Sequence, residues 1–129
     1  GKTGVNKKDI DDKKYFIKMS GNATFKVAVK RMTDVIREAL VFNDLSMEDV
    51  AILVPHQANQ RIIRAVAERL EYPMEKVFMN IHKYGNTSGA SIPIGIDEAK
   101  RSGRIKPGET SVLGAVGAGL TWGSAVIKW

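Results

Sequence analysis

The sequence contains no cysteine, few aromatic residues and no long hydrophobic segment. Without cysteine, the chain has no disulfide framework, no cysteine-ligated zinc and no thiol nucleophile of its own. Aromatic residues make up only 7% of the chain and do not alternate with basic ones, unlike the stacking surfaces of RNA-binding domains. No apolar run approaches the ~20 residues of a membrane-spanning helix. We expect no membrane anchor, and the charged N-terminus, unlike a secretory signal, favours a cytoplasmic location.

The composition is that of an ordinary globular domain. The 129 residues are 43% hydrophobic and 26% charged, which suits one folded unit with a real core. The net charge of +6 would attract acidic partners such as nucleic acid, anionic lipid or an acidic protein. The same charge is equally consistent with a surface that only keeps the protein in solution.

The order of predicted elements indicates an α/β fold. Residues 1–14 are rich in lysine and aspartate and are expected to form a charged tail or linker, followed by one domain over 15–129. Hydrophobic periodicity then predicts, in order, a strand over 15–19, a helix over 22–40, a short turn capped by Ser46, a strand over 50–54, a helix over 57–70, a strand over 77–81, a helix over about 86–100, and strands over 110–116 and 121–129. This alternation predicts a mixed, mostly parallel sheet with helices packed on it and a C-terminal antiparallel hairpin.

Polar side chains follow the predicted strand over 50–54 directly, in the segment from Pro55 to Arg61. In open α/β sheets, ligands bind beyond the carboxyl ends of the strands. We expect His56 to lie at the start of the next helix, where the helix N-terminus disfavours a positive imidazole and keeps the ring neutral. Position alone does not distinguish a functional His56 from a structural histidine.

Two further segments have a similar layout. Asn86 follows the next predicted strand and offers an amide donor that cannot ionise, although a helix cap would use the same residue type. Residues 114–123 are glycine-rich but lack the GxGxxG spacing and precede no helix, so we predict a tight bend rather than a dinucleotide site. The sequence has neither an HExxH metal motif nor a GxSxG nucleophile elbow.

Three motifs in one order, PHQAN at 55–59, YGNTS at 84–88 and GAGLTWG at 117–123, resemble the C-terminal half of the β-ketoacyl-acyl carrier protein synthase III family. The similarity also includes GNATFK at 21–26 and runs from about Tyr15 to Trp129. These are thiolase-fold condensing enzymes with a Cys-His-Asn active site. The resemblance implies that His56 and Asn86 are catalytic. It also implies that the cysteine lies in an N-terminal half outside this chain, which is either an excised domain or a subunit of a split enzyme.

The resemblance implies further roles. The backbone N–H of Ala118 would belong to an oxyanion hole, and Lys26 and Arg61 would match basic positions where an acidic carrier protein docks. Positions lining the pantetheine channel match Gly21, Asn22, Phe25, Ala58 and Asn59. The implied reaction is a decarboxylative Claisen condensation of an acyl-CoA primer with malonyl-acyl carrier protein, at the initiation of fatty acid biosynthesis, without a cofactor or a metal. The full-length enzyme would be a homodimer.

Two positions depart from the family pattern, and other functions compete with this one. Val116 replaces the usual phenylalanine beside the cysteine, so the sequence does not specify the acyl-chain preference. His82 replaces a commonly acidic residue, and we assign it no role. The alternatives are a non-catalytic thiolase-like module that binds carrier protein or coenzyme A, and a related synthase of secondary metabolism. Retention of both His56 and Asn86 favours an enzyme, because a mere binder needs neither. Nucleic-acid binding would leave the PHQAN and YGNTS motifs unexplained.

Overall fold

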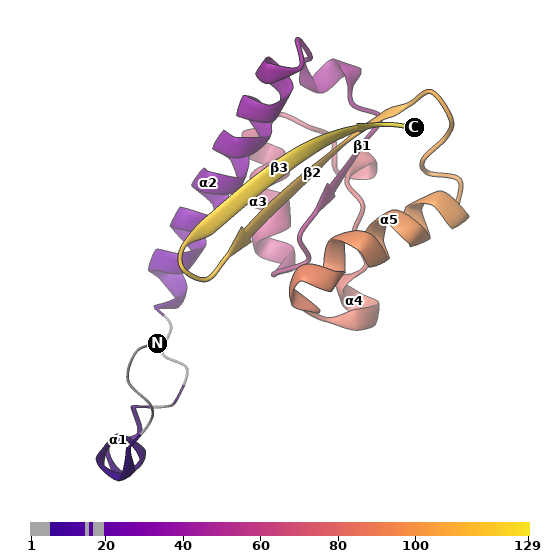
Figure 1. Ribbon diagram of the computed structural model, residues 1–129. Helices are drawn as coiled ribbons and strands as arrows, with labels where there is room; N and C mark the ends of the chain where they lie inside the picture. Colours follow the sequence, from indigo (N-terminus) through magenta and orange to yellow (C-terminus); the bar gives the residue numbers. More distant parts are fainter. Residues whose placement is uncertain (1–5, 15, 17–19) are drawn as a thin grey trace.

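A three-stranded sheet lies between two layers of helices (Figure 1). The computed structural model describes residues 6–14, 16 and 20–129. Strand β1 (Ile52–Pro55) pairs in parallel with β2 (Thr110–Gly117), and β2 pairs antiparallel with β3 (Thr121–Lys128). The mixed sheet and its C-terminal hairpin confirm the predicted α/β fold class.

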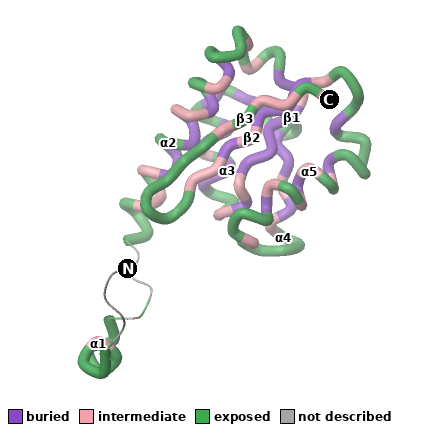
Figure 2. The backbone as a smooth tube through the Cα atoms, viewed as in Figure 1, coloured by how far each residue is buried: buried purple, intermediate pink, exposed green. Residues whose placement is uncertain are grey.

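Helices α2 (Gly21–Phe42) and α3 (Gln60–Arg69) cover one face of the sheet. The apolar residues predicted at three- and four-residue spacing form the inner face of α2, as expected for an amphipathic helix. Side chains from both helices and from β1 and β2 meet in a core with almost no exposed surface, which includes Met32, Ile36, Leu53, Ile63, Val66 and Val112. Figure 2 shows that the buried positions follow the sheet and the helix faces turned toward it.

Helix α5 (Ser91–Arg101) covers the opposite face. Its Ala99 belongs to a second core cluster there, together with Ile52, Val54, Phe78 and Ile105. Because side chains alternate along a strand, Leu53 faces α2 and α3 while its two neighbours in β1 face α5. This arrangement explains why the apolar run over 50–54 is continuous, since β1 is buried on both faces. Pro93 lies in the first turn of α5, where a helix tolerates proline.

Three predicted elements differ from the structure. The helix expected over about 86–100 begins only at Ser91, as α5. The strand expected over 77–81 is reduced to a single parallel bridge between Leu53 and Val77, after which the chain forms α4 (Ile81–Tyr84). The helix expected from residue 57 begins only at Gln60. The start of α3 is set by Asn59, whose side chain caps the helix by accepting the N–H of Arg61. The lost strand has another cause, because the side chain of Gln57 is buried and hydrogen bonds to the backbone of residues 78–81. Its bonds occupy the N–H groups that a strand would direct to a neighbouring strand.

The shorter elements complete the chain. They are α1 (Lys7–Asp11), η1 (Met47–Asp49), η2 (Met74–Lys76) and η3 (Ser88–Ala90). Ser46 caps η1 as predicted, and α1, within the expected tail, contains no buried residue. The strand predicted over 15–19 lies outside the described residues except for Phe16. Within the described ranges no helix is long and apolar enough to cross a bilayer.

Gly114 of β2 allows α2 to approach the sheet closely. A Cβ atom at this position would lie 2.6 Å from Cδ1 and 2.9 Å from Cγ1 of Ile36, which is itself fully buried. We expect Gly114→Ala to lower the free energy of unfolding by about 1–3 kcal/mol, because the packed helix must shift. Gly123→Ala, in β3 with nothing within 4 Å of its added Cβ, is the matched control. Equal stability of the two variants in urea unfolding would contradict this account.

Candidate active site

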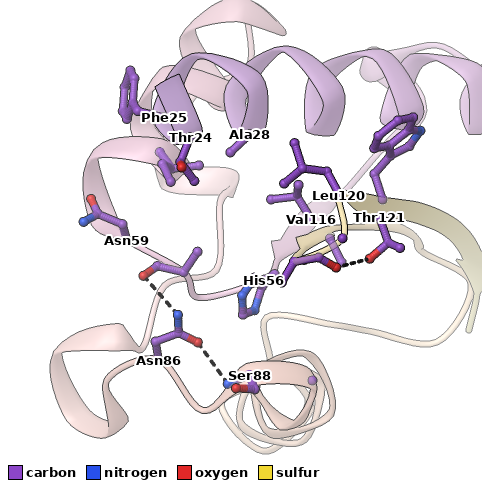
Figure 3. Close-up of a pocket in the computed structure, with 18 of the residues that line it drawn as sticks. Thr24, Phe25, Ala28, His56, Asn59, Asn86, Ser88, Val116, Leu120 and Thr121 are labelled. Carbon is purple, nitrogen blue, oxygen red and sulfur yellow. Dashed lines mark hydrogen bonds between the residues drawn. The ribbon is translucent and has the colours of Figure 1, made fainter. Parts of the chain in front are cut away.

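A cavity of about 1130 Å³ opens where the N-terminal ends of α2 and α3 meet the β2–β3 bend and the segment before α5 (Figure 3). Nine of the residues singled out by the sequence line it: Gly21, Asn22, Phe25, His56, Ala58, Asn59, Arg61, Asn86 and Ala118. Lys26 is exposed on α2, beside Phe25, but does not line the cavity. The four motifs, which are far apart in the sequence, therefore surround one space.

His56 is half-buried at the carboxyl end of β1. Its backbone N–H donates to the carbonyl of Gly114 at 2.7 Å, which extends the parallel pairing by one bond and fixes the backbone of His56. Its ring nitrogen Nδ1 lies 2.7 Å from Oγ of Ser91. Burial lowers the pKa of the imidazole. The neutral ring was expected to result from the N-terminus of the next helix, but α3 begins four residues after His56. The cause is instead desolvation of the ring by burial.

Gln57 connects the segment after β1 to the segment that leads to Asn86. Its Nε2 donates to the carbonyls of Pro55 at 2.8 Å and Phe78 at 3.2 Å. Its Oε1 accepts the N–H groups of Asn80 at 3.0 Å and Ile81 at 3.1 Å. Sequence reasoning missed this role by placing Gln57 at the start of a helix. The sequence signal for this role was the glutamine of the PHQAN motif, and no chemistry was assigned to that glutamine.

Asn86 is exposed at the cavity wall. Its Oδ1 accepts the N–H of Ser88 at 2.9 Å, and its Nδ2 lies 3.5 Å from the carbonyl of Ala58, which is a long and weak contact (Figure 3). The oxygen side of the amide is therefore fixed by the backbone, while the NH₂ group has donor capacity left for a ligand.

The opposite wall is the bend between β2 and β3. Val116 and Leu120 present apolar side chains near His56 (Figure 3). Ala118 lies between the end of β2 and the start of β3. The carbonyl of Ala118 accepts from the hydroxyl of Thr121 at 3.4 Å. No helix follows this glycine-rich segment, as predicted, so it is a bend and not a dinucleotide loop.

The basic residues of α2 and α3 are of two kinds. Lys30 forms an ion pair with Asp34 at 2.7 Å, and Arg37 donates to a backbone carbonyl of α3. Arg61 lies at the cavity instead, with its guanidinium 5.6 Å from the centre of the Phe25 ring. Arg61 is also the only charged residue among those that line the cavity in the described part of the chain. The interior of the site is therefore neutral and its positive charge lies at one side.

Glu98 of α5 holds the segment before Asn86 in place. Its carboxylate accepts from Nδ2 of Asn80 at 2.8 Å, from the hydroxyl of Tyr84 at 2.7 Å and from Nζ of Lys83 at 3.1 Å. The hydrogen bonds from Asn80 and Tyr84 are the main causes that lower the pKa of Glu98 from 4.5 to about 2. The ionised carboxylate of Glu98 is thus the form that accepts all three hydrogen bonds from α4 and its N-cap residue Asn80.

The depressed pKa of Glu98 predicts a loss of stability in acid. A carboxyl with a lowered folded-state pKa contributes its full stabilisation above the unfolded pKa of 4.5 and loses it as the pH falls toward about 2. We expect Glu98→Gln to flatten the dependence of unfolding free energy on pH in this window. Glu68→Gln, on the exposed face of α3, should keep the wild-type slope in the same urea titrations. Identical slopes for Glu98→Gln and wild type would show that the ionised Glu98 carboxylate does not stabilise the fold.

No group of three or more histidine, cysteine, aspartate or glutamate side chains is arranged to hold a metal within the ranges that the structure describes. The cavity instead offers uncharged donors, an imidazole and a carboxamide, on a partly apolar surface. Such donors suit a ligand that carries or develops negative charge on an oxygen atom.

A family model and curated relatives match most of the chain. The model of the C-terminal domain of 3-oxoacyl-[acyl-carrier-protein] synthase III matches residues 40–129. The β-ketoacyl-[acyl-carrier-protein] synthase III of Actinobacillus pleuropneumoniae is 50% identical over 119 residues, which cover 92% of this chain and 38% of that protein. The chain thus spans well under half the length of such relatives.

Solved structures show the same relationship. The synthase III of Aquifex aeolicus matches with a TM-score of 0.87 and 49% identity, over 92% of this chain and 38% of that one. The enzyme of Pseudomonas aeruginosa matches with a TM-score of 0.87 and 40% identity, over 98% of this chain and 38% of that one. With half of its residues shared across nearly its whole length, and with the family's C-terminal domain matched, the chain belongs to the 3-oxoacyl-[acyl-carrier-protein] synthase III family.

Proposed function

We propose that this chain is the C-terminal part of a β-ketoacyl-acyl carrier protein synthase III, which condenses an acyl-CoA primer with malonyl-acyl carrier protein at the initiation of fatty acid biosynthesis. The observation that carries the proposal is the convergence of His56 and Asn86, thirty residues apart in the sequence, on one cavity. The relatives at about 50% identity carry the name of this activity.

The two donors fit the decarboxylation step. When malonyl thioester loses carbon dioxide, the electrons of the broken C–C bond pass into an enolate whose negative charge rests on the thioester oxygen. His56 and Asn86 each donate a hydrogen bond to that oxygen as the charge develops. Neither donor brings a formal charge, because burial keeps the imidazole neutral and a carboxamide does not ionise.

The second half of the reaction needs a group from outside this chain. The enolate carbon attacks the carbonyl of an acyl group held as a thioester, a new C–C bond forms, and the thiolate leaves. The chain has no cysteine, so the nucleophile comes from the N-terminal half of the enzyme. The N–H of Ala118, at the β2–β3 bend, contributes to the oxyanion hole for this step.

The rest of the cavity accepts the pantetheine arm. The residues assigned to it lie at the N-terminal ends of α2 and α3, on the open side of the cavity: Gly21, Asn22, Phe25, Ala58 and Asn59. Lys26 and Arg61 flank this opening and dock the acidic carrier protein. Stacking on Phe25 limits the positions that the Arg61 guanidinium can take.

Two alternatives are less well supported. A non-catalytic binding module would not need the pair of neutral donors around one cavity. A synthase of secondary metabolism is represented by the priming β-ketosynthase of the R1128 polyketide pathway, but at 34% identity it is more distant than the relatives at about 50%. The cytoplasmic location and the homodimer remain predictions.

The catalytic roles can be tested in a chimera in which residues 20–129 replace the corresponding part of the Aquifex aeolicus synthase, which is 49% identical. We expect His56→Ala and Asn86→Ala each to slow decarboxylation of malonyl-carrier protein by ~100- to 1000-fold, because each removes one donor to the enolate oxygen. Transfer of a radiolabelled acyl group to the cysteine should continue in both variants.

Two controls accompany this experiment. His82→Ala removes the other histidine, which is exposed and outside the cavity, and Asn43→Ala removes an exposed asparagine at the far end of α2. Both should decarboxylate at the rate of the unmodified chimera. Retained decarboxylation together with lost acylation, in either cavity variant, would show that the roles are wrongly assigned. The chain without its N-terminal half should form no ketoacyl product.

The docking role of Arg61 can be tested in the same chimera. We expect Arg61→Glu to raise the Michaelis constant for malonyl-carrier protein and to leave that for malonyl-CoA almost unchanged, because exposed charges mainly steer association. The effect should shrink as salt is added, since screening acts beyond ~8 Å at physiological ionic strength. Lys106→Glu, in the loop between α5 and β2, is the control. Equal losses with both substrates would assign Arg61 to the structure of the cavity.

A further inference from the structure

Ser91, the first residue of α5, is buried directly behind His56. Its side chain is 2% exposed, and its Oγ lies 2.7 Å from Nδ1 of His56. The same oxygen accepts the backbone N–H of Gln57 at 3.2 Å. Ser91 is therefore in contact with both the ring and the backbone that carries it.

Counting protons decides which group donates. A serine hydroxyl has one proton and two lone pairs, and the backbone N–H of Gln57 can only donate, so it occupies one lone pair. If Nδ1 carried the proton of the neutral ring, Oγ would accept twice and its own proton would need a third partner. Among the described residues the Ser91 side chain bonds only to His56 and Gln57. A buried donor without a partner is costly, whereas donation from Oγ–H to Nδ1 satisfies every group.

We propose that Ser91 is a positioning residue, whose hydroxyl donates to Nδ1 and thereby fixes the neutral ring of His56 as the tautomer with its proton on Nε2. In that tautomer the free side of the ring presents an N–H to the cavity. In the other tautomer it would present a lone pair, which repels a developing oxyanion. The donation from Nε2–H to a developing oxyanion rests on the proposed function, whereas the tautomer of His56 is independent of that function.

The same contact disfavours the imidazolium form. Protonation of Nδ1 would place two donors against each other and force the Ser91 proton out of its bond. The surroundings of the ring act in the same direction, because burial disfavours its charged form and no acidic side chain is among the described residues that line the cavity, whose one charged member is Arg61. The ring is thus kept uncharged by its partner as well as by its surroundings.

Nitrogen NMR of the 129-residue chain tests this directly. In ¹⁵N–¹H long-range spectra recorded above the titration of the ring, we expect a protonated Nε2 and an unprotonated Nδ1 for His56. Ser91→Ala should lower the ratio of the two tautomers by about five-fold or more, the size of one net hydrogen bond, and raise the pKa of the ring. Ser102→Ala removes a serine at the other end of α5, whose hydroxyl bonds only to carbonyls of that helix, and should leave the His56 signals unchanged.

A second variant tests whether the effect of Ser91→Ala comes from the lost hydrogen bond or from misfolding. Ser91→Cys keeps the size of the side chain but offers only a weak donor, and it should shift the ratio in the same direction as Ser91→Ala. A wild-type ring protonated on Nδ1, or unchanged tautomer ratios in the folded variants, would overturn the inference. In the chimera, a shifted tautomer with an undiminished rate of decarboxylation would support the assignment of Ser91 and contradict the role proposed for His56.

Discussion

The buried carboxamide of Gln57 is the interaction on which the arrangement of the site depends. Its NH₂ group donates two hydrogen bonds and its carbonyl oxygen accepts two. These four bonds use the full capacity of a carboxamide. A buried amide without these partners would cost several kcal/mol in transfer from water. Because its partners lie on both segments, the loop that carries His56 and the segment that leads to Asn86 cannot move independently.

The sheet brings the third part of the site to the same edge. Since β1 and β2 run in parallel, both end on the side where the cavity opens, and the bond from His56 to Gly114 joins them there. The antiparallel return of β3 places the bend beyond β2 against the imidazole (Figure 3). Close packing of α2 on Gly114 then sets the position of the helix whose N-terminal end forms the mouth of the cavity.

Charge is distributed in a way that separates two tasks. The groups that would meet the reacting thioester are neutral, and their surroundings disfavour ionisation. Among the basic residues of α2 and α3, Arg61 lies at one side of the cavity, while Lys30 and Arg37 are already bound to a carboxylate and a backbone carbonyl. Neutral hydrogen-bond donors inside the cavity stabilise negative charge on a ligand oxygen as that charge develops. Exposed cations, by contrast, attract an acidic partner from a distance. A cation at the side of the cavity is therefore suited to attracting an acidic partner and not to the chemical step.

The sequence by itself determined the helices α2 and α3 and the C-terminal hairpin, and its motifs singled out His56 and Asn86, which line one cavity. Periodic apolar residues report directly on which face of an element is buried, and the motifs around His56 and Asn86 are local, contiguous patterns. It did not determine the loss of the strand over 77–81, the late start of α3, or the parts played by Gln57, Ser91 and Glu98. Apart from the start of α3, which Asn59 caps locally, these features depend on hydrogen bonds between residues 14 to 35 positions apart, such as Glu98 with Tyr84 and Ser91 with His56. A polar side chain has the same local signature whether it faces water or the interior, and only the tertiary structure decides which partners it finds there.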